Sequence, residues 1–345
     1  MSFRKLAIAA AVALAAAAAG ATAARAQEVV LKFHTFMPPQ SAVWLDMHVP
    51  WMDKVEKESG GRIRFERYPA MQLGGKPNNL YDQVKDGVAD VTWVLPAWTA
   101  GRFPRVEVFE LPFMMTNAEA TSKALWEYVQ THAPDEFADV KVLALHVHGP
   151  GVIHTKSRQV ETIGDLRGLK VRGPTRQITK LLASLGATPV GMPLPGIPDA
   201  LSKGVIGGAV IPWEVVPAVK VNELARYHLE FAPEAGSLYT AVFIMAMNQA
   251  RYDALPPDLK KVIDDNSGLE TSGWLGMVQQ GNDVKGRKTA VGNTIVTLDA
   301  KGAEPFRKAS ASVDDGWVKE MNGKGFDGQK LLDGARALVR KHTKP

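Results

Sequence analysis

The chain has 345 residues, of which 46% are hydrophobic and 22% charged, so its composition is that of a globular protein rather than a disordered or fibrous one. Its length predicts two lobes, and the absence of cysteine excludes disulfides, thiolate metal sites and thiol nucleophiles. The formal net charge of +5 falls to +2 without residues 1–26, which carry three of the 41 basic and none of the 36 acidic residues. So weak a bias gives no reason to expect a nucleic-acid partner.

Residues 1–26 have the pattern of a cleaved signal peptide. Arg4 and Lys5 supply a positive start, residues 6–24 form an almost unbroken apolar run, and Ala24-Arg25-Ala26 is a small-x-small cleavage site. The alternative is a permanent transmembrane helix, because the run approaches the roughly 20 residues that span a bilayer. Alanine dominates the run and partitions weakly into lipid. We therefore expect cleavage before Gln27 and a mature protein in the periplasm.

The segments that follow the leader alternate between the patterns of strands and helices. Strands are expected at 29–36, 62–68 and 89–94, with helices at 42–60 and 80–87. This βαβαβ order predicts a largely parallel sheet, with a ligand crevice at the carboxyl ends of its strands.

The alternation begins again near residue 150. Strands are expected at 151–154, 170–172 and 205–210, and a helix at 175–185. A long apolar strand at 238–247 and helical pattern from 256 to 280 follow.

We therefore predict an α/β fold of two lobes that close on a small molecule like a clamp. The predicted boundaries place residues 27–149 and 239–278 in lobe 1, and residues 150–238 and 279–345 in lobe 2. Gly149 and Gly151 lie where the chain is expected to cross between the lobes, because glycine permits unusual torsions there.

Familiar catalytic signatures are absent from the sequence, including HExxH, GxSxG, GxxxxGK[ST] and the EF-hand spacing. We therefore expect a binding protein rather than an enzyme, with no cofactor. His146 and His148 share one face of an expected strand and can in principle ligate a metal. Since no carboxylate cluster lies near them in the sequence, we interpret them as ordinary polar residues at a strand end.

A series of short motifs runs through the chain in a characteristic order. The central one is the segment 164–174, GDLRGLKVRGP, which places Arg172 at the end of a strand and just before a helix. The others are QLGG at 72–75, RFP at 102–104, LPF at 111–113, GATPV at 186–190, and ALxxGVxxG at 200–208. Together they resemble the extracytoplasmic solute-binding subunit of tripartite ATP-independent periplasmic (TRAP) transporters, of the C4-dicarboxylate-binding-protein type. The resemblance covers essentially the whole mature chain.

The resemblance implies a two-lobed clamp with crossing strands and a long bracing helix. It also implies that Arg172, the arginine of the GLKxR segment, forms a salt bridge with the ligand carboxylate. A guanidinium suits this role, because it stays charged and can pair with both oxygens of a carboxylate. The implied partners are a small organic acid and the small and large membrane subunits of the transporter, and we expect a monomer.

The chain departs from the sugar-acid-binding members of this family at several cleft positions. Phe36, Leu95, Trp98 and Ile211 are apolar where those members carry polar or charged residues, and Val152 stands where they carry a second arginine. Such walls would leave the hydroxyls of a polyhydroxylated ligand unpaired, at a cost of roughly 1–3 kcal/mol each. We therefore predict an aromatic or hydrophobic monocarboxylate as the ligand.

The predicted ligand-binding residues combine one cation with aromatic and apolar side chains, and His148 is included as a possible second donor to a carboxylate. They are Arg172, Trp213, Trp98, Phe36, Tyr239, His148, Leu95 and Ile211. One alternative is a small 2-oxo or 2-hydroxy acid held through a bridging metal, to which Glu214 would give an oxygen. Two others are a periplasmic enzyme on the same scaffold and a sensory binding protein.

Overall fold

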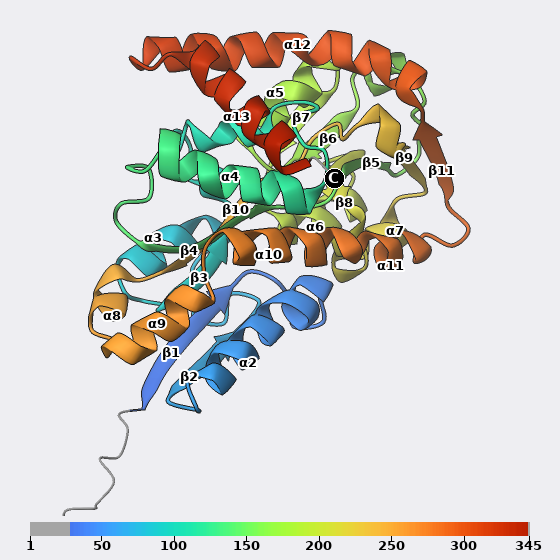
Figure 1. Ribbon diagram of the computed structural model, residues 1–345. Coiled ribbons are helices and arrows are strands. Elements are labelled where there is room, and N and C mark those ends of the chain that lie inside the picture. Colours follow the sequence, from blue (N-terminus) through green and yellow to red (C-terminus); the bar gives the residue numbers. More distant parts are fainter. Residues whose placement is uncertain (1–27, 344–345) are drawn as a thin grey trace, which may run out of the picture.

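The computed structural model describes residues 28–343, so the predicted signal peptide lies outside the described residues. Two mixed sheets are flanked by helices (Figure 1). The first sheet has the strand order β2-β1-β3-β10-β4, with bounds Ile63–Tyr68, Val29–Thr35, Val91–Val94, Val242–Met247 and Lys141–Val147. The second has the order β11-β9-β5-β8-β6-β7, with bounds Thr294–Leu298, Tyr227–Phe231, Gly151–Thr155, Gly208–Pro212, Lys170–Gly173 and Thr188–Gly191.

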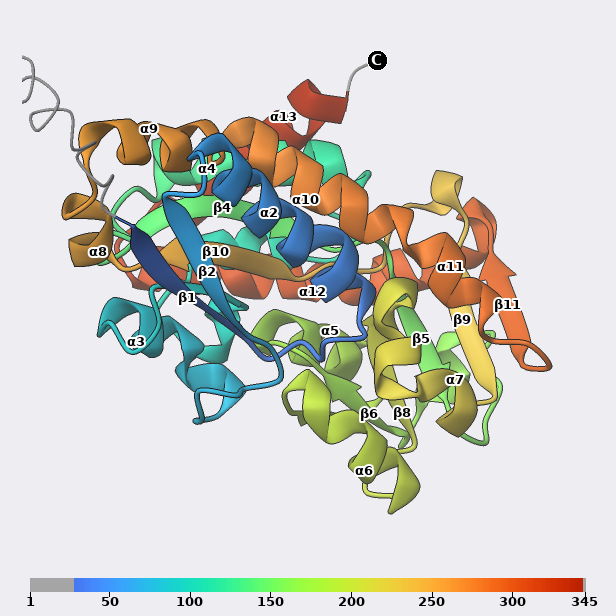
Figure 2. The same ribbon diagram turned by 90° about the horizontal axis from the view of Figure 1, so that it is seen from below.

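The chain passes between the two sheets at several places. It leaves β4 of the first sheet, turns through Gly149 and Pro150, and enters β5 of the second sheet. It returns from β9 to β10. Helices α10 (Leu269–Gly281) and α11 (Asp283–Lys288) then run from β4 and α4 toward the turn after β8 (Figure 2). The predicted α/β clamp with crossing strands is confirmed in its architecture.

The sheets are less parallel than the sequence predicted. β2, β1 and β3 are parallel, but β10 pairs antiparallel with both β3 and β4. In the second sheet β7, β6 and β8 are parallel, whereas β5 is antiparallel to β8 and β9. The returning strands explain the difference, because each enters its sheet from the opposite direction to its neighbours.

Each sheet has a point where the strand order reverses. The chain goes from β1 through α2 (Val49–Glu58) to β2, and then through α3 (Leu80–Lys85) to β3 on the other side of β1. In the second sheet it goes from β6 through α5 (Arg176–Ser184) to β7, and then through α6 (Ile197–Ser202) to β8 on the other side of β6. Ligand crevices form outside the carboxyl ends of strands at such reversals.

Several element bounds differ from those predicted. The expected helix at 42–60 is a π-helical segment, η1 (Val43–His48), followed by α2, which has Pro50 in its first turn. Proline has no N–H to donate, which fits a change of helical hydrogen bonding at this point. The strand expected at 205–210 begins only at Gly208, because residues 204–206 turn back onto α6 through hydrogen bonds to Leu201 and Ala200.

The remaining helices cover the sheets from outside. They are α4 (Ala118–His132), α7 (Val221–Leu224), α8 (Gln249–Asp253), α9 (Pro257–Asp265), α12 (Ala300–Gly323) and α13 (Gly328–Thr343). The 24-residue α12 packs on α5, whereas α13 returns to pack on α4 beside the first sheet (Figure 1). The chain end therefore contacts both halves, although our boundaries place all of residues 279–345 with lobe 2. No helix within residues 28–343 is long and apolar enough to cross a membrane.

Candidate functional site

A cavity lies between the two sheets, at the carboxyl ends of the strands where each order reverses. About 420 Å³ of empty space lies within it, including the part that opens to solvent. Its lining comprises Phe36, Met37, Val43, Trp93, Leu95, Trp98, His148, Arg172, Pro174, Leu194, Val210, Ile211, Pro212, Glu214, Val215, Tyr239, Ala241, Phe243 and Gln279. Seven of the eight predicted ligand-binding residues are among them, and Trp213 is the exception.

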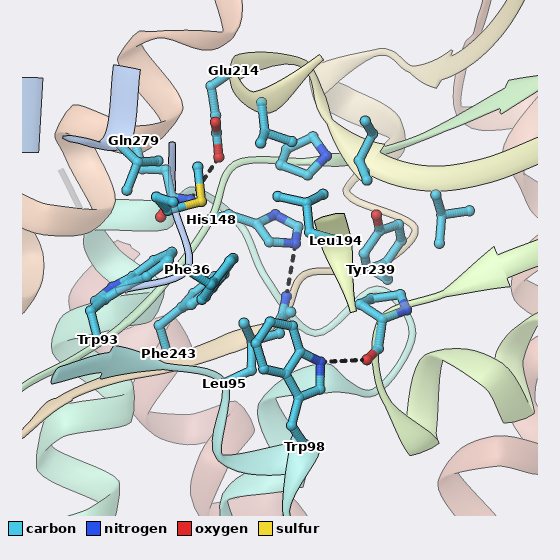
Figure 3. A pocket seen from close by; sticks show the side chains of 18 of the residues that line it. Phe36, Trp93, Leu95, Trp98, His148, Leu194, Glu214, Tyr239, Phe243 and Gln279 are labelled. Atoms are coloured by element: carbon cyan, nitrogen blue, oxygen red, sulfur yellow. Dashed lines mark hydrogen bonds between the residues drawn. The ribbon is translucent and has the colours of Figure 1, made fainter. Parts of the chain in front are cut away.

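The first sheet supplies an aromatic wall (Figure 3). The ring of Phe36 stacks on Trp93 with centroids 5.3 Å apart and contacts Trp98 at 4.8 Å. Behind them Trp93 stacks nearly parallel on Phe243 at 4.3 Å. Such contacts stabilise the packed rings beyond the burial of area alone.

Sequence reasoning missed Trp93 and Phe243, although a signal for both was present. Trp93 lies two residues before Leu95 on β3, and Phe243 lies two residues after Ala241 on β10. Residues at this spacing face the same side of a strand. With Leu95 and Tyr239 assigned to the cavity, the alternation of side chains along a strand would have added Trp93 and Phe243 to the predicted lining.

Arg172 is a buried cation with no anionic partner in this part of the chain. Its side chain lies at the end of β6, where Nε donates to the carbonyl oxygen of Met192 at 2.9 Å and Nη1 to that of Val210 at 3.1 Å. Burial lowers the pKa of Arg172 to about 10, so it is still charged at neutral pH. No carboxylate within residues 28–343 forms an ion pair with it. A buried guanidinium oriented by two carbonyls and left without a counter-charge is suited to receive an anion.

His148 lines the cavity, but it cannot serve as the expected second donor to a carboxylate. Its Nε2 accepts a hydrogen bond from the backbone N–H of Ala241 at 3.1 Å, so its proton is on Nδ1, which donates to the carbonyl of Gly149 at 2.5 Å. Burial, with a smaller contribution from the charge of Arg172, lowers the pKa of His148 to about 4. Both nitrogens of the neutral ring are thus occupied by backbone groups.

Tyr239 lies beside both His148 and Arg172. Its ring meets that of His148 edge-on at 5.5 Å, and its buried hydroxyl has no hydrogen-bond partner in the described part of the chain. Burial raises the pKa of Tyr239, while the nearby Arg172 charge lowers it. A Cβ on Gly151 would lie 2.0 Å from the Tyr239 ring, so the crossing segment must be glycine for Tyr239 to occupy this place. The hydroxyl is therefore a neutral donor available to a ligand.

Trp213 does not line the cavity, contrary to the prediction. Its indole Nε1 donates to Glu230 at 2.8 Å, and its ring packs on His154 and His228. The 3₁₀ turn η7 (Trp213–Val215) sends consecutive side chains in different directions, because three residues complete one turn. Glu214 occupies the cavity wall instead.

Glu214 is paired with Gln279 of α10, a residue that sequence reasoning missed. Gln279 Nε2 donates to Glu214 Oε1 at 2.7 Å (Figure 3), and the backbone N–H of Glu214 donates to Asp283 at 2.9 Å. Burial and the nearby Asp283 raise the pKa of Glu214 to about 8. No group of three or more His, Asp or Glu side chains within residues 28–343 is arranged to hold a metal ion.

Trp98 links the two halves at one edge of the cavity. It lies in η3 (Pro96–Trp98), directly after β3, and its Nε1 donates to the carbonyl of Pro174 after β6 at 3.0 Å (Figure 3). The half-buried indole also lines a larger open groove next to the cavity. Its position makes Trp98 part of the wall between the enclosed space and solvent.

Comparison with known proteins shows close structural relatives. One is a TRAP solute-binding protein from Rhodoferax ferrireducens in complex with copurified benzoate; it is 66% identical, with a TM-score of 0.91 over 91% of this chain and 98% of that one. A marine metagenome TRAP solute-binding protein specific for aromatic acids is 48% identical, with a TM-score of 0.90 over 92% of this chain and 100% of that one. Its structures are complexes with co-crystallised 3-hydroxybenzoate and, for a triple surface mutant, with metahydroxyphenylacetate after thermal exchange of ligand.

A more distant structure, a TRAP periplasmic solute-binding protein from Bordetella bronchiseptica with bound (R)- and (S)-mandelate, is 28% identical. Its TM-score is 0.82 over 91% of this chain and 99% of that one. The family model described as "Bacterial extracellular solute-binding protein, family 7" matches residues 33–320. The chain therefore belongs to the family 7 bacterial extracellular solute-binding proteins, the solute-binding subunits of TRAP transporters.

Proposed function

We propose that this protein is the receptor of a TRAP transporter for aromatic monocarboxylates, which it captures and delivers to the membrane subunits. The observation that carries the proposal is the unpaired, buried Arg172 facing an aromatic wall within one cavity. The guanidinium binds the carboxylate of the ligand, and Phe36 with its neighbouring rings packs against the aromatic ring of the ligand.

The relatives support this choice of ligand class. Benzoate, 3-hydroxybenzoate and mandelate each combine one carboxylate with one aromatic ring, and the proteins that bind them share between 28% and 66% of their residues with this chain. A dicarboxylate would bring a second charge into the cavity. Within residues 28–343, Arg172 is the one lysine or arginine that lines it, and the neutral His148 is fully hydrogen-bonded. An unpaired carboxylate in an enclosed site costs several kcal/mol.

Capture fits the arrangement of the two halves. Arg172 belongs to the second sheet and the aromatic wall to the first, so a ligand that contacts both favours the closed arrangement over an open one. Membership of this family places the protein outside the cytoplasm, and we infer that the mature chain begins near Gln27 and acts in the periplasm as a binding protein without catalysis.

Isothermal titration calorimetry on the chain from Gln27 onward tests the proposal. Benzoate, 3-hydroxybenzoate and mandelate are compared with succinate and a uronate at neutral pH. We expect the aromatic acids to bind at least about a hundredfold more tightly, because the competitors either leave a charge unpaired or bury unpaired hydroxyls. A preference for succinate or the uronate would contradict the proposal.

A further inference from the structure

Besides the Tyr239 hydroxyl, two buried polar atoms of the cavity lining have no hydrogen-bond partner among residues 28–343. They are Oε2 of Glu214 and Oε1 of Gln279, whose residues are only 4% and 3% exposed. Polar atoms buried in this way are uncommon, because each loses its hydrogen bonds to water without replacement. Their side chains both line the space that we assign to the ligand.

Hydrogen bonds and close helix packing hold Glu214 in place. The Gln279 amide bonds Glu214 Oε1, and Asp283 on α11 accepts the backbone N–H of Glu214. Helix α11 approaches so closely that a Cβ on Gly286 would lie 1.9 Å from the carbonyl oxygen of Trp213. The free oxygens thus belong to a preorganised group rather than to loose side chains.

The pair also lies apart from Tyr239, whose pKa the cation Arg172 affects. In the view of Figure 3, Glu214 and Gln279 lie to one side of His148 and Tyr239 to the other. The charge of Arg172 affects the pKa of Tyr239 more than the charges of Asp283 and Glu214 do, whereas Asp283 is the charge that most affects the pKa of Glu214. A ligand whose carboxylate binds Arg172 therefore presents another part of itself to Glu214.

The protonation of Glu214 makes the pair compatible with an anionic ligand. With its pKa raised to about 8, this carboxyl group is mostly neutral at pH 7 and offers both a donor and an acceptor. An ionised glutamate would repel a bound carboxylate. The neutral acid and the amide instead match a small hydrogen-bonding group that carries no charge.

We propose that Glu214 and Gln279 form a polar subsite that recognises a hydroxyl group on the ring of the aromatic acid. This inference rests on the proposed function. It assigns to these two residues the discrimination between aromatic acids with and without a ring hydroxyl. One relative, 48% identical to this chain, has structures in complex with two acids that carry a ring hydroxyl. The hydroxyl would replace the missing partner of Glu214 Oε2 or Gln279 Oε1.

The test compares each of 2-, 3- and 4-hydroxybenzoate with its fluorobenzoate counterpart and with benzoate, by calorimetry. Fluorine is close to hydroxyl in size but cannot donate a hydrogen bond. For the wild type we expect at least one hydroxy acid to bind about tenfold more tightly than its fluoro counterpart. In Glu214→Leu this ratio should fall to about one, whatever the change in benzoate affinity, and Glu214→Gln should keep most of it.

Controls separate the two levels of the proposal. Met37→Leu changes an apolar part of the wall and should leave the hydroxy-to-fluoro ratio unaltered. If Glu214→Leu does not fold, the hydroxy-to-fluoro affinity ratios of the wild type and of Glu214→Gln still test the subsite. A wild type that binds benzoate without preferring any hydroxy acid overturns the subsite alone. One that binds none of these acids overturns the proposed function and the subsite together.

Discussion

The two walls of the cavity differ in chemistry. The first-sheet wall consists largely of rings held by one another, with Phe36, Trp93 and Phe243 in contact. The second-sheet wall carries the charge and the carboxyl group, Arg172 and Glu214, on short strand ends and turns. One half therefore offers apolar surface, whose contacts with a ligand are not directional. The other half fixes the orientation of the ligand through hydrogen bonds.

Substitution of Arg172 should have the largest effect on ligand binding. Both Arg172→Ala and Arg172→Lys should weaken benzoate binding by a hundredfold or more, since an ammonium cannot reproduce a planar fork of donors. Calorimetry measures the loss, and the exposed Arg167→Ala in the same half is the control. Wild-type affinity in Arg172→Lys would show that a simple point charge suffices or that the contact lies elsewhere.

The carboxyl group of the second wall should appear in the pH dependence of stability. Burial raises the pKa of Glu214 from 4.5 to about 8, so the folded state holds this proton more tightly than the unfolded state does. The free energy of unfolding therefore falls as pH rises between these values. Relative to the wild type, Glu214→Gln should gain on the order of 1–3 kcal/mol between pH 5 and pH 8, because its side chain does not ionise.

Urea unfolding of both proteins at several pH values measures this difference. Other buried carboxyl groups, such as Glu110 with its pKa raised to about 8, titrate in both proteins and largely cancel in the comparison. A constant difference between variant and wild type across this range would mean that Glu214 ionises normally.

Substitution in the aromatic wall should weaken benzoate binding less than substitution of Arg172 does. Phe36→Ala removes a ring that stacks on Trp93 and faces the ligand, and we expect benzoate affinity to fall by about tenfold, roughly 1–2 kcal/mol. Phe326→Ala, on a more exposed ring, is the matched control. An equal loss for benzoate and for a non-aromatic monocarboxylate would point to collapse of the wall rather than loss of a ring contact.

The smallest effect is expected where the walls meet. Trp98→Phe keeps a ring beside Phe36 but removes the hydrogen bond to Pro174, worth about 1 kcal/mol. We expect benzoate to dissociate several-fold faster, measured by stopped-flow fluorescence, with a smaller change in the association rate. An unchanged dissociation rate would mean that this hydrogen bond does not hold the closed state.

Part of the site was predictable because it depends on local order along the chain. Arg172 ends a strand just before a helix, and Phe36 and Leu95 follow strands that alternate with helices, so all three had to lie at the carboxyl ends of parallel strands. The same reasoning did not place Trp213, which lies outside the cavity lining, because a single 3₁₀ turn decides whether it or Glu214 faces the cavity.

The sequence by itself determined the family, the α/β class, the single cation and the apolar character of the cleft, because these follow from residue type, alternation and motif order. Only the tertiary structure decided which distant segments share the cavity. Gln279 reaches Glu214 from a helix 65 residues away, and Phe243 reaches Trp93 from an antiparallel strand inserted late in the chain. One of the two backbone groups that occupy His148, the N–H of Ala241, likewise comes from a remote segment, whereas the other belongs to the neighbouring Gly149. Contacts of this kind depend on how the two sheets are placed, and no local pattern encodes that placement.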